Sequence, residues 1–347
     1  MIKAHSIQVK QNSSLSERAA GIGFLANIYA RFCQKSQSDY GWAISPISFD
    51  LLEKALLNGE ISGYWVEDTA YAEPVGFMLY RLESHRAIEI NVIYCETNER
   101  KIFLDKLLRL FIEDNRHTEG WDVVSYAMLG VQDQFIRTIC WYGFKPIGQA
   151  VLALDFTDPL SVQIVCQQSV PLPEEPLYAL SSWQPHYAGA TAQNIFDAFS
   201  KATDALWDPR FRSLNGGRRI MGELTAGLMG RFMSDCAMVL LKNDQPIGFC
   251  FLLQDDVTSA HIPLIGLNPS EKRKGLGKAL LHATIKQTIQ QMLAGQNNIL
   301  KIRTTTDTDN IPALKMYRRL GFKEEANYPH VYLTREKLLA FQAGRWC

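Results

Sequence analysis

The residues best suited to chemistry in this sequence stand at positions 265–278, which read IGLNPSEKRKGLGK. An apolar segment runs into Pro269, a basic turn follows, and Gly275 and Gly277 stand where a helix can begin. Glycines let backbone N–H groups approach phosphate oxygens, and a helix dipole favours negative charge at its N-terminus. The stretch therefore predicts a phosphate or pyrophosphate site, although the same residues could also form a solvated basic turn.

Neither of the two commonest nucleotide motifs fits this stretch. The dinucleotide fingerprint needs a third glycine at the position of Leu280. The P-loop needs a Gly-Lys pair followed by Ser or Thr, and here Gly277 and Lys278 are followed by Ala279. A phosphate site at this turn must therefore belong to another class.

A second stretch, residues 310–322, reads NIPALKMYRRLGF. Together the two stretches resemble motifs A and B of the GNAT superfamily of acyl-CoA-dependent N-acyltransferases. Motif A is an Arg/Gln-x-x-Gly-x-Gly/Ala run after a strand that ends before a proline, and motif B is Asn-x-x-Ala-x-x-x-Tyr closing in Leu-Gly-Phe. Lys272 departs from the pattern, because the family usually has Arg or Gln there and a lysine makes no bidentate contact. The resemblance extends over residues 190–335.

The resemblance implies acetyl-CoA as co-substrate and no metal. The backbones of Ile265, Gly266 and Leu267 would pair with the pantetheine arm, in a gap where this strand splays from the next one. Asn310 would contact the cofactor or, as an equal alternative, cap the helix that begins before Pro312. The pyrophosphate would be held by the following turn: Lys272, Arg273, Lys274, Gly275, Leu276, Gly277 and Lys278.

Aminolysis of a thioester needs a neutral amine, a stabilised oxyanion and a hydrogen-bond donor for the departing sulfur. By the resemblance Tyr317 would be this donor, whereas its spacing alone also fits simple packing on a helix. His261 lies on the strand before motif A, where some members of the family carry a Glu or His base. His261 is therefore the candidate general base, with a structural histidine as the alternative.

An internal repeat accompanies these motifs. EPVGF at 73–77 recurs as QPIGF at 245–249, and GFK at 143–145 recurs at 321–323. The order is the same and the offsets are nearly equal, which predicts two copies of one unit. The predicted boundaries are a first domain at 1–167, a linker at 168–176 and a second domain at 177–347.

The first copy lacks the residues that carry the predicted chemistry. Its turn at 96–103 contains no glycine and places two carboxylates where phosphate would sit. Ile139 stands at the position of Tyr317. The first copy is therefore predicted to be degenerate and only the second copy catalytic.

Hydrophobic periodicity predicts the same order of elements in both copies. Antiparallel hairpins followed by a strand, helix, strand crossover predict an α/β fold with a mixed sheet, and the motifs make this two tandem GNAT folds. In the first copy we expect helices at 16–36, 48–57, 99–113 and 131–141 and strands at 62–67, 75–83, 87–95, 121–127 and 147–155. In the second copy we expect helices at 191–206, 219–233, 275–293 and 310–320, strands at 237–242, 247–254, 258–267 and 299–304, and two short final strands.

Composition excludes several other classes. The 347 residues contain 36 Lys and Arg and 36 Asp and Glu, and this neutral balance disfavours a nucleic-acid partner. No run of 18 apolar residues occurs and residues 1–14 lack an apolar signal segment, so we expect a cytoplasmic protein without a membrane partner. The seven cysteines are scattered without Cys-x-x-Cys spacing, which disfavours a disulfide framework or a metal cluster.

These observations predict an N-acetyltransferase whose second copy moves an acetyl group from acetyl-CoA to an amine by direct attack. The acceptor could be a small molecule or a protein, and the chain a monomer or a homodimer. The alternative is a non-catalytic acyl-CoA-binding or scaffolding protein whose first copy recruits a partner.

Overall fold

The computed structural model describes residues 2–7, 22–40, 46–68, 73–96, 100–129, 133–173 and 177–340. The chain forms two compact units, Met1–Ile147 with Tyr328–Cys347 and Gly148–Asn327. In the described part of the chain, no helix has the length and apolar composition needed to cross a bilayer. Residues 16–21 of the first expected helix, 97–99 of the degenerate turn and 174–176 of the linker lie outside the described residues.

The first unit is a twisted sheet with the strand order β1-β2-β3-β4-β5-β15. All neighbouring strands are antiparallel except β4 and β5, which are parallel. Its elements are β1 (Ile2–Ser6), η1 (Gly23–Leu25), α2 (Ala26–Tyr40), α3 (Phe49–Leu57), β2 (Ser62–Asp68), β3 (Glu73–Leu82), β4 (Ala87–Cys95), α4 (Arg100–His117), β5 (Val123–Ala127), α5 (Asp133–Trp141), the end of β15 (Lys323–Thr334) and α12 (Arg335–Ala340).

Helices cover both faces of this sheet, because successive strand residues point to opposite faces and both sets are apolar. Met78 of β3 packs with α4 and α5 in one buried core. Its neighbour Phe77 packs with α2 and α3 in another. Tertiary packing of the two apolar faces, more than helix propensity, therefore holds these helices in place.

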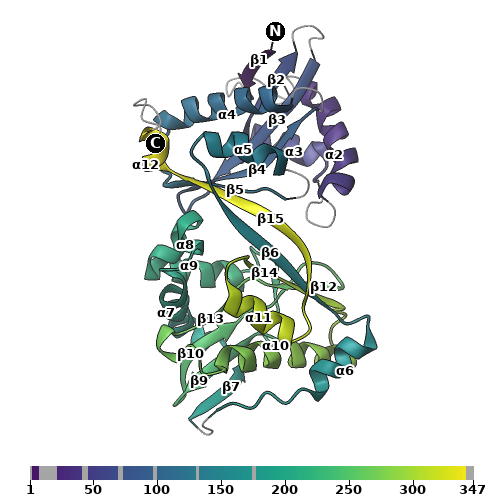
Figure 1. The fold of residues 1–347 in the computed structure, drawn as a ribbon, viewed down its shortest axis with the longest axis vertical. Helices are drawn as coiled ribbons and strands as arrows, with labels where there is room; N and C mark the ends of the chain where they lie inside the picture. Colours follow the sequence, from purple (N-terminus) through teal and green to yellow (C-terminus); the bar gives the residue numbers. More distant parts are fainter. Residues whose placement is uncertain are drawn as a thin grey trace. The chain divides into compact units, whose positions relative to one another are not determined.

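The second unit has two sheets, with strand orders β6-β14-β12-β11-β8 and β13-β10-β9-β7. Helices α10 and α11 pack on one face through residues such as Leu280 and Leu314, and α7 and α9 pack on the other through Ile195 and Ile220 (Figure 1). Its elements are β6 (Lys145–Asp155), α6 (Pro159–Gln167), β7 (Tyr178–Ser182), η3 (Pro185–Tyr187), α7 (Ala188–Phe199), α8 (Asp204–Trp207), η4 (Pro209–Arg212), α9 (Leu214–Thr225), β8 (Arg231–Phe232), β9 (Met238–Lys242), β10 (Gln245–Cys250), β11 (Leu253–Gln254), β12 (Ser259–Ile262), β13 (Ile265–Leu267), η5 (Pro269–Glu271), α10 (Leu276–Leu293), β14 (Lys301–Asp307) and α11 (Ile311–Arg319).

The two repeats exchange their last strands. Residues 149–155 of β6 end the first repeat but pair antiparallel with β14 in the second unit. Residues 330–334 of β15 end the second repeat but pair antiparallel with β5 in the first unit. For this reason the compact units change at 147–148 and 327–328, outside the predicted linker.

The mixed α/β architecture predicted from the sequence is confirmed, with local differences. The helix expected at 191–206 is divided into α7 and α8, and the strand expected at 247–254 is divided into β10 and β11, which lie in different sheets. The strand expected at 258–267 is broken into β12 and β13 around Pro263. The helix expected to reach residue 233 stops at Thr225, because Gly227 and Gly230 adopt positive φ angles of 74° and 121°. The two short final strands form one long strand, β15.

Candidate active site

At the centre of the second unit, the chain that forms β12 and then β13 first pairs with β14 and then separates from it. β12 pairs in parallel with β14 from Ser259↔Lys301 to Ile262↔Thr304. Pro263 then interrupts the ladder because proline has no N–H to donate. The chain continues as β13, which pairs with β10 in the other sheet, Ile265 lying opposite Cys250. The two strands therefore diverge directly after residue 262, as the splayed strand expected from the sequence requires.

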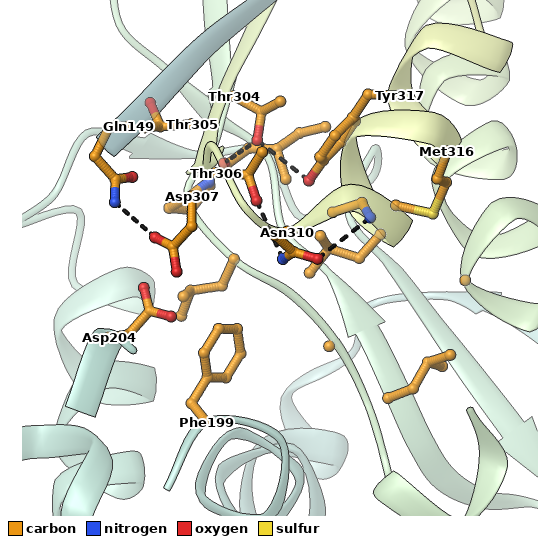
Figure 2. A pocket seen from close by; sticks show the side chains of 18 residues that line it. Gln149, Phe199, Asp204, Thr304, Thr305, Thr306, Asp307, Asn310, Met316 and Tyr317 are labelled. Carbon is orange, nitrogen blue, oxygen red and sulfur yellow. Dashed lines mark hydrogen bonds between the residues drawn. The ribbon is translucent and has the colours of Figure 1, made fainter. Parts of the chain in front are cut away.

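A cavity of about 210 Å³ opens between the diverging strands. Figure 2 shows it between β14, the start of α11 and the α7–α8 segment. Six residues predicted from the sequence line it: Ile265, Gly266, Leu267, Gly277, Asn310 and Tyr317. The structure thus brings the strand, the second glycine and both polar residues of the second motif to one space.

Glycine stands at each of the two positions at the start of α10 for a different physical reason. Gly275 precedes the helix with φ 81°, a left-handed conformation that other residues adopt only with strain. A Cβ on Gly277 would lie 3.5 Å from both Leu267 Cδ1 and Met316 Sδ, which is ordinary contact. Packing inside the protein therefore does not require glycine at 277, and the missing side chain leaves cavity space open.

Gly266 is required by its neighbours. A Cβ there would lie 2.7 Å from Phe249 Cζ and 3.1 Å from Ala198 Cβ. Its small size lets α7 approach β13 closely. Gly266 therefore shapes one wall of the cavity through packing, and the close approach expected from the sequence is to protein atoms.

Part of the basic turn is used to build the turn itself. Lys274 Nζ lies 2.8 Å from Glu271 Oε2, and Lys242 Nζ lies 2.8 Å from Glu271 Oε1. The Tyr178 hydroxyl donates to the same carboxylate at 2.7 Å. Hydrogen bonds from Lys242, then Lys274 and Tyr178, lower the pKa of the Glu271 carboxyl to about 2. The Lys274 side chain therefore anchors the turn from within.

The other basic side chains of the turn remain available to a ligand. Within the described part of the chain, Lys272, Arg273 and Lys278 take part in no ion pair. Lys272 and Arg273 are exposed and Lys278 is half-buried. Leu276, in contrast, is fully buried in the core under α10, so only its backbone could face a ligand.

Tyr317 is buried in the cavity wall, with 2% of its surface exposed. Its hydroxyl lies 3.4 Å from Thr304 Oγ1, which is 3.3 Å from the Ile262 carbonyl oxygen at the point where the strands part. Burial raises the pKa of the phenol well above its ordinary value. Tyr317 therefore stays protonated over the physiological range and can donate a hydrogen bond into the cavity.

Asn310 fills the capping role that the sequence left open. Its Oδ1 accepts from the Ala313 backbone N–H at 3.3 Å, and its Nδ2 donates to Thr306 Oγ1 at 3.2 Å. These bonds begin α11 in front of Pro312. Asn310 also lines the cavity, so the capping bond fixes its position at the cavity edge.

His261 is not among the residues that line the cavity. Its neighbours Ala260 and Ile262 belong to the core under α10 and α11, so the alternation of β12 directs His261 to the opposite face. There its Nδ1 contacts the Asp255 carboxylate. The role of His261 as a base stays a prediction from the sequence.

Among the other residues that line the cavity are four, from four different elements, that the sequence did not single out. Phe199 comes from α7, Asp204 from α8, Gln149 from β6 and Asp307 from β14 (Figure 2). Gln149 Nε2 donates to Asp307 Oδ1 at 2.6 Å. Only the acidic run ahead of Asn310 could have pointed to Asp307, since the other three reach the site through tertiary packing.

In the first unit the corresponding gap is filled by a side chain. β4 and β5 pair in parallel for four residues, from Ala87↔Val123 to Ile90↔Tyr126, which matches the pairing of β12 and β14. Tyr126 therefore stands where Thr304 stands. It is 2% exposed, and its hydroxyl accepts from the Ile93 backbone N–H at 3.3 Å. The space that a ligand arm would need is occupied by Tyr126.

Comparisons with known proteins agree with this geometry. Residues 202–322 match the family model described as the Acetyltransferase (GNAT) family. An N-alpha-acetyltransferase of Sulfurisphaera tokodaii is 31% identical over 80 residues, which are 23% of this chain and 45% of that relative. The match thus spans less than half the length of this curated relative.

Two solved structures show how far the fold extends. A GCN5-related N-acetyltransferase from Sphaerobacter thermophilus matches with a TM-score of 0.57 and 14% identity over 96% of both chains. A tandem GNAT protein from the clavulanic acid biosynthesis pathway matches with a TM-score of 0.52 and 10% identity, over 96% of this chain and 99% of that one. At such identity the likeness concerns the fold, which is that of two tandem GNAT units. Within this fold, residues 202–322 are the part of the chain that matches the GNAT family model.

Proposed function

We propose that this protein transfers an acetyl group from acetyl-CoA to an amine, using the cavity of the second unit. The observation that carries the proposal is the gap between β13 and β14, which ends beside Tyr317 and is continued by the open position at Gly277. In this proposal the pantetheine arm fills the gap and the Lys272–Lys278 turn holds the pyrophosphate.

The proposed reaction is a direct aminolysis. The amine nitrogen attacks the thioester carbonyl carbon, and the tetrahedral intermediate collapses by breaking the carbon–sulfur bond. The sulfur leaves as a thiolate that accepts a hydrogen bond from the Tyr317 hydroxyl and takes up the proton lost by the attacking nitrogen. Burial of Tyr317 supports this role because it keeps the phenol protonated.

Release of free thiol from acetyl-CoA, measured with the full chain and a panel of amines, tests the proposal. We expect release that depends on the amine, together with the acetylated amine as product. Acetyl-CoA binding without amine-dependent release would instead support the non-catalytic acyl-CoA-binding or scaffolding protein.

A further inference from the structure

The cavity has two chemically different sides. Ile302 and Thr304 of β14 face α10 and α11, so the alternation of the strand directs Thr305 and Asp307 to the opposite face, where Phe199 of α7 and Asp204 of α8 also line the cavity. Tyr317 borders the first side, next to Thr304. The second side carries Asp204 and Asp307, whose carboxylates point toward one another in Figure 2.

These carboxylates set the charge of the cavity. Among the described residues that line it, Asp204 and Asp307 are the acidic ones, and no Lys or Arg stands with them. Asp307 is held by Gln149 at 2.6 Å, whereas no other described side chain hydrogen bonds to the Asp204 carboxylate. A side chain thus fixes the orientation of Asp307, whereas among the described groups the Asp204 carboxylate accepts a hydrogen bond only from its own backbone N–H and keeps acceptor capacity for a ligand.

We propose that Asp204 and Asp307 bind the ammonium group of the acceptor, and that Asp204 removes the proton that makes the amine nucleophilic. This inference rests on the proposed function. The substrate class it assigns is an amine that is cationic in solution and has no acidic group next to the nitrogen, because a carboxylate there would meet Asp307 in a cavity without a lining cation.

The protons balance in this scheme. The ammonium gives one proton to Asp204, and the neutral amine attacks the thioester. The second proton leaves the nitrogen for the departing sulfur, beside Tyr317, so the products are the amide and the free thiol. Asp204 then releases its proton to water when the uncharged amide has left.

The surroundings of Asp204 suit a base that works near neutral pH. Burial first, and then the charges of Asp307 and Asp208, raise the pKa of the Asp204 carboxyl to about 6. Asp208 is itself paired with Arg210, at 2.6 Å, and Arg210 also contacts Glu223. No cation therefore remains on this side to offset Asp307 among the described residues that surround Asp204.

The test compares Asp204→Asn with wild type in the thiol-release assay from pH 5 to pH 9, with a simple alkylamine as acceptor. We expect kcat/KM of wild type to rise through about pH 6 and then level off. In Asp204→Asn this limb disappears and kcat/KM at pH 7.5 falls by roughly 10²-fold, within the usual range for general-base catalysis. Acetyl-CoA affinity, measured by calorimetry, stays unchanged and shows that the variant is folded.

Matched variants keep the outcome clear. Asp309→Asn removes a charge of the same kind from an exposed position near Asp307, outside the cavity, and should behave as wild type. An Asp204→Asn enzyme with wild-type kcat/KM overturns the inference, as does a pH limb lost in His261→Ala but kept in Asp204→Asn. If wild-type protein releases no thiol with any amine, the proposed function itself is contradicted, and the inference that rests on it is contradicted as well.

Discussion

Replacing Asp204 by asparagine removes a charge that the fold desolvates, while the size of the side chain stays the same. The pKa of this carboxyl rises from an ordinary value of 3.8 to about 6 in the folded chain. A carboxyl with a raised pKa contributes stability below its unfolded pKa, and this contribution is lost as the pH rises through the folded value. The desolvated charge therefore lowers the free energy of unfolding of wild type at neutral pH, whereas the asparagine variant carries no such charge.

The magnitude follows from the size of the shift. About two units at about 1.4 kcal/mol each amount to about 3 kcal/mol as an upper limit, reached above pH 7. Roughly half of this is already present at pH 5, which lies between the two pKa values. We therefore expect Asp204→Asn to be more stable than wild type at pH 5 and at pH 8, with the larger difference in free energy of unfolding at pH 8.

Urea denaturation at pH 5 and pH 8, followed by tryptophan fluorescence, measures this difference. Trp207 lies in the same helix as Asp204 and reports on the segment concerned. The Asp309→Asn variant, which removes a carboxylate from an exposed position, is the control. An Asp204→Asn margin that is equal at pH 5 and pH 8, or a variant less stable than wild type, would refute the desolvation argument.

Three further predictions concern other parts of the account. Tyr317→Phe should reduce kcat at least ten-fold with little change in acetyl-CoA affinity, because the long 3.4 Å contact with Thr304 contributes little to binding or stability; an unchanged kcat would exclude Tyr317 as the donor to sulfur. Glu271→Gln should be less stable than wild type at pH 7, and the difference should shrink toward pH 3, because the pKa of this carboxyl is lowered to about 2 and its stabilisation is lost as the pH falls; a pH-independent difference in denaturation midpoints would contradict this. A fragment of residues 170–327 should aggregate, because it lacks β6 and leaves β14 without its partner, whereas residues 148–327, which keep β6 and omit the segment of β15 that pairs with β5, should stay monodisperse in size-exclusion chromatography; equal behaviour of both fragments would argue against the strand exchange.

Much of the side of the cavity that we propose for the cofactor could be predicted because its residues are close in sequence. Gly275, Gly277 and Tyr317 lie in two short stretches whose spacing alone determines a turn, a helix start and a helix face. Local hydrogen bonding then positions them. The capping bond of Asn310 is of the same local kind, which is why the sequence already contained it as an alternative.

The side that we propose for the acceptor could not be predicted, because it is assembled by tertiary contacts. Asp204 belongs to a short helix of four residues, and Gln149 comes from the strand that ends the first repeat but pairs in the second unit. β6 is buried continuously from Gln149 to Leu154, a pattern that fits either sheet, so its sequence does not predict the strand exchange. Tyr126 is a similar case, since only the register of β4 and β5 shows that it fills the gap.

The central claim is that acetyl-CoA binds the second unit alone, at the turn that begins with Lys272 and the gap beyond it. Calorimetric titration of the full chain with acetyl-CoA tests this most directly, with Gly277→Asp as the variant and Gly189→Asp, where a side chain meets nothing within 4 Å, as the control. The account predicts one equivalent bound per chain, binding lost in Gly277→Asp without unfolding, and binding kept in Gly189→Asp. Two equivalents per chain, or unchanged affinity in Gly277→Asp, would contradict it.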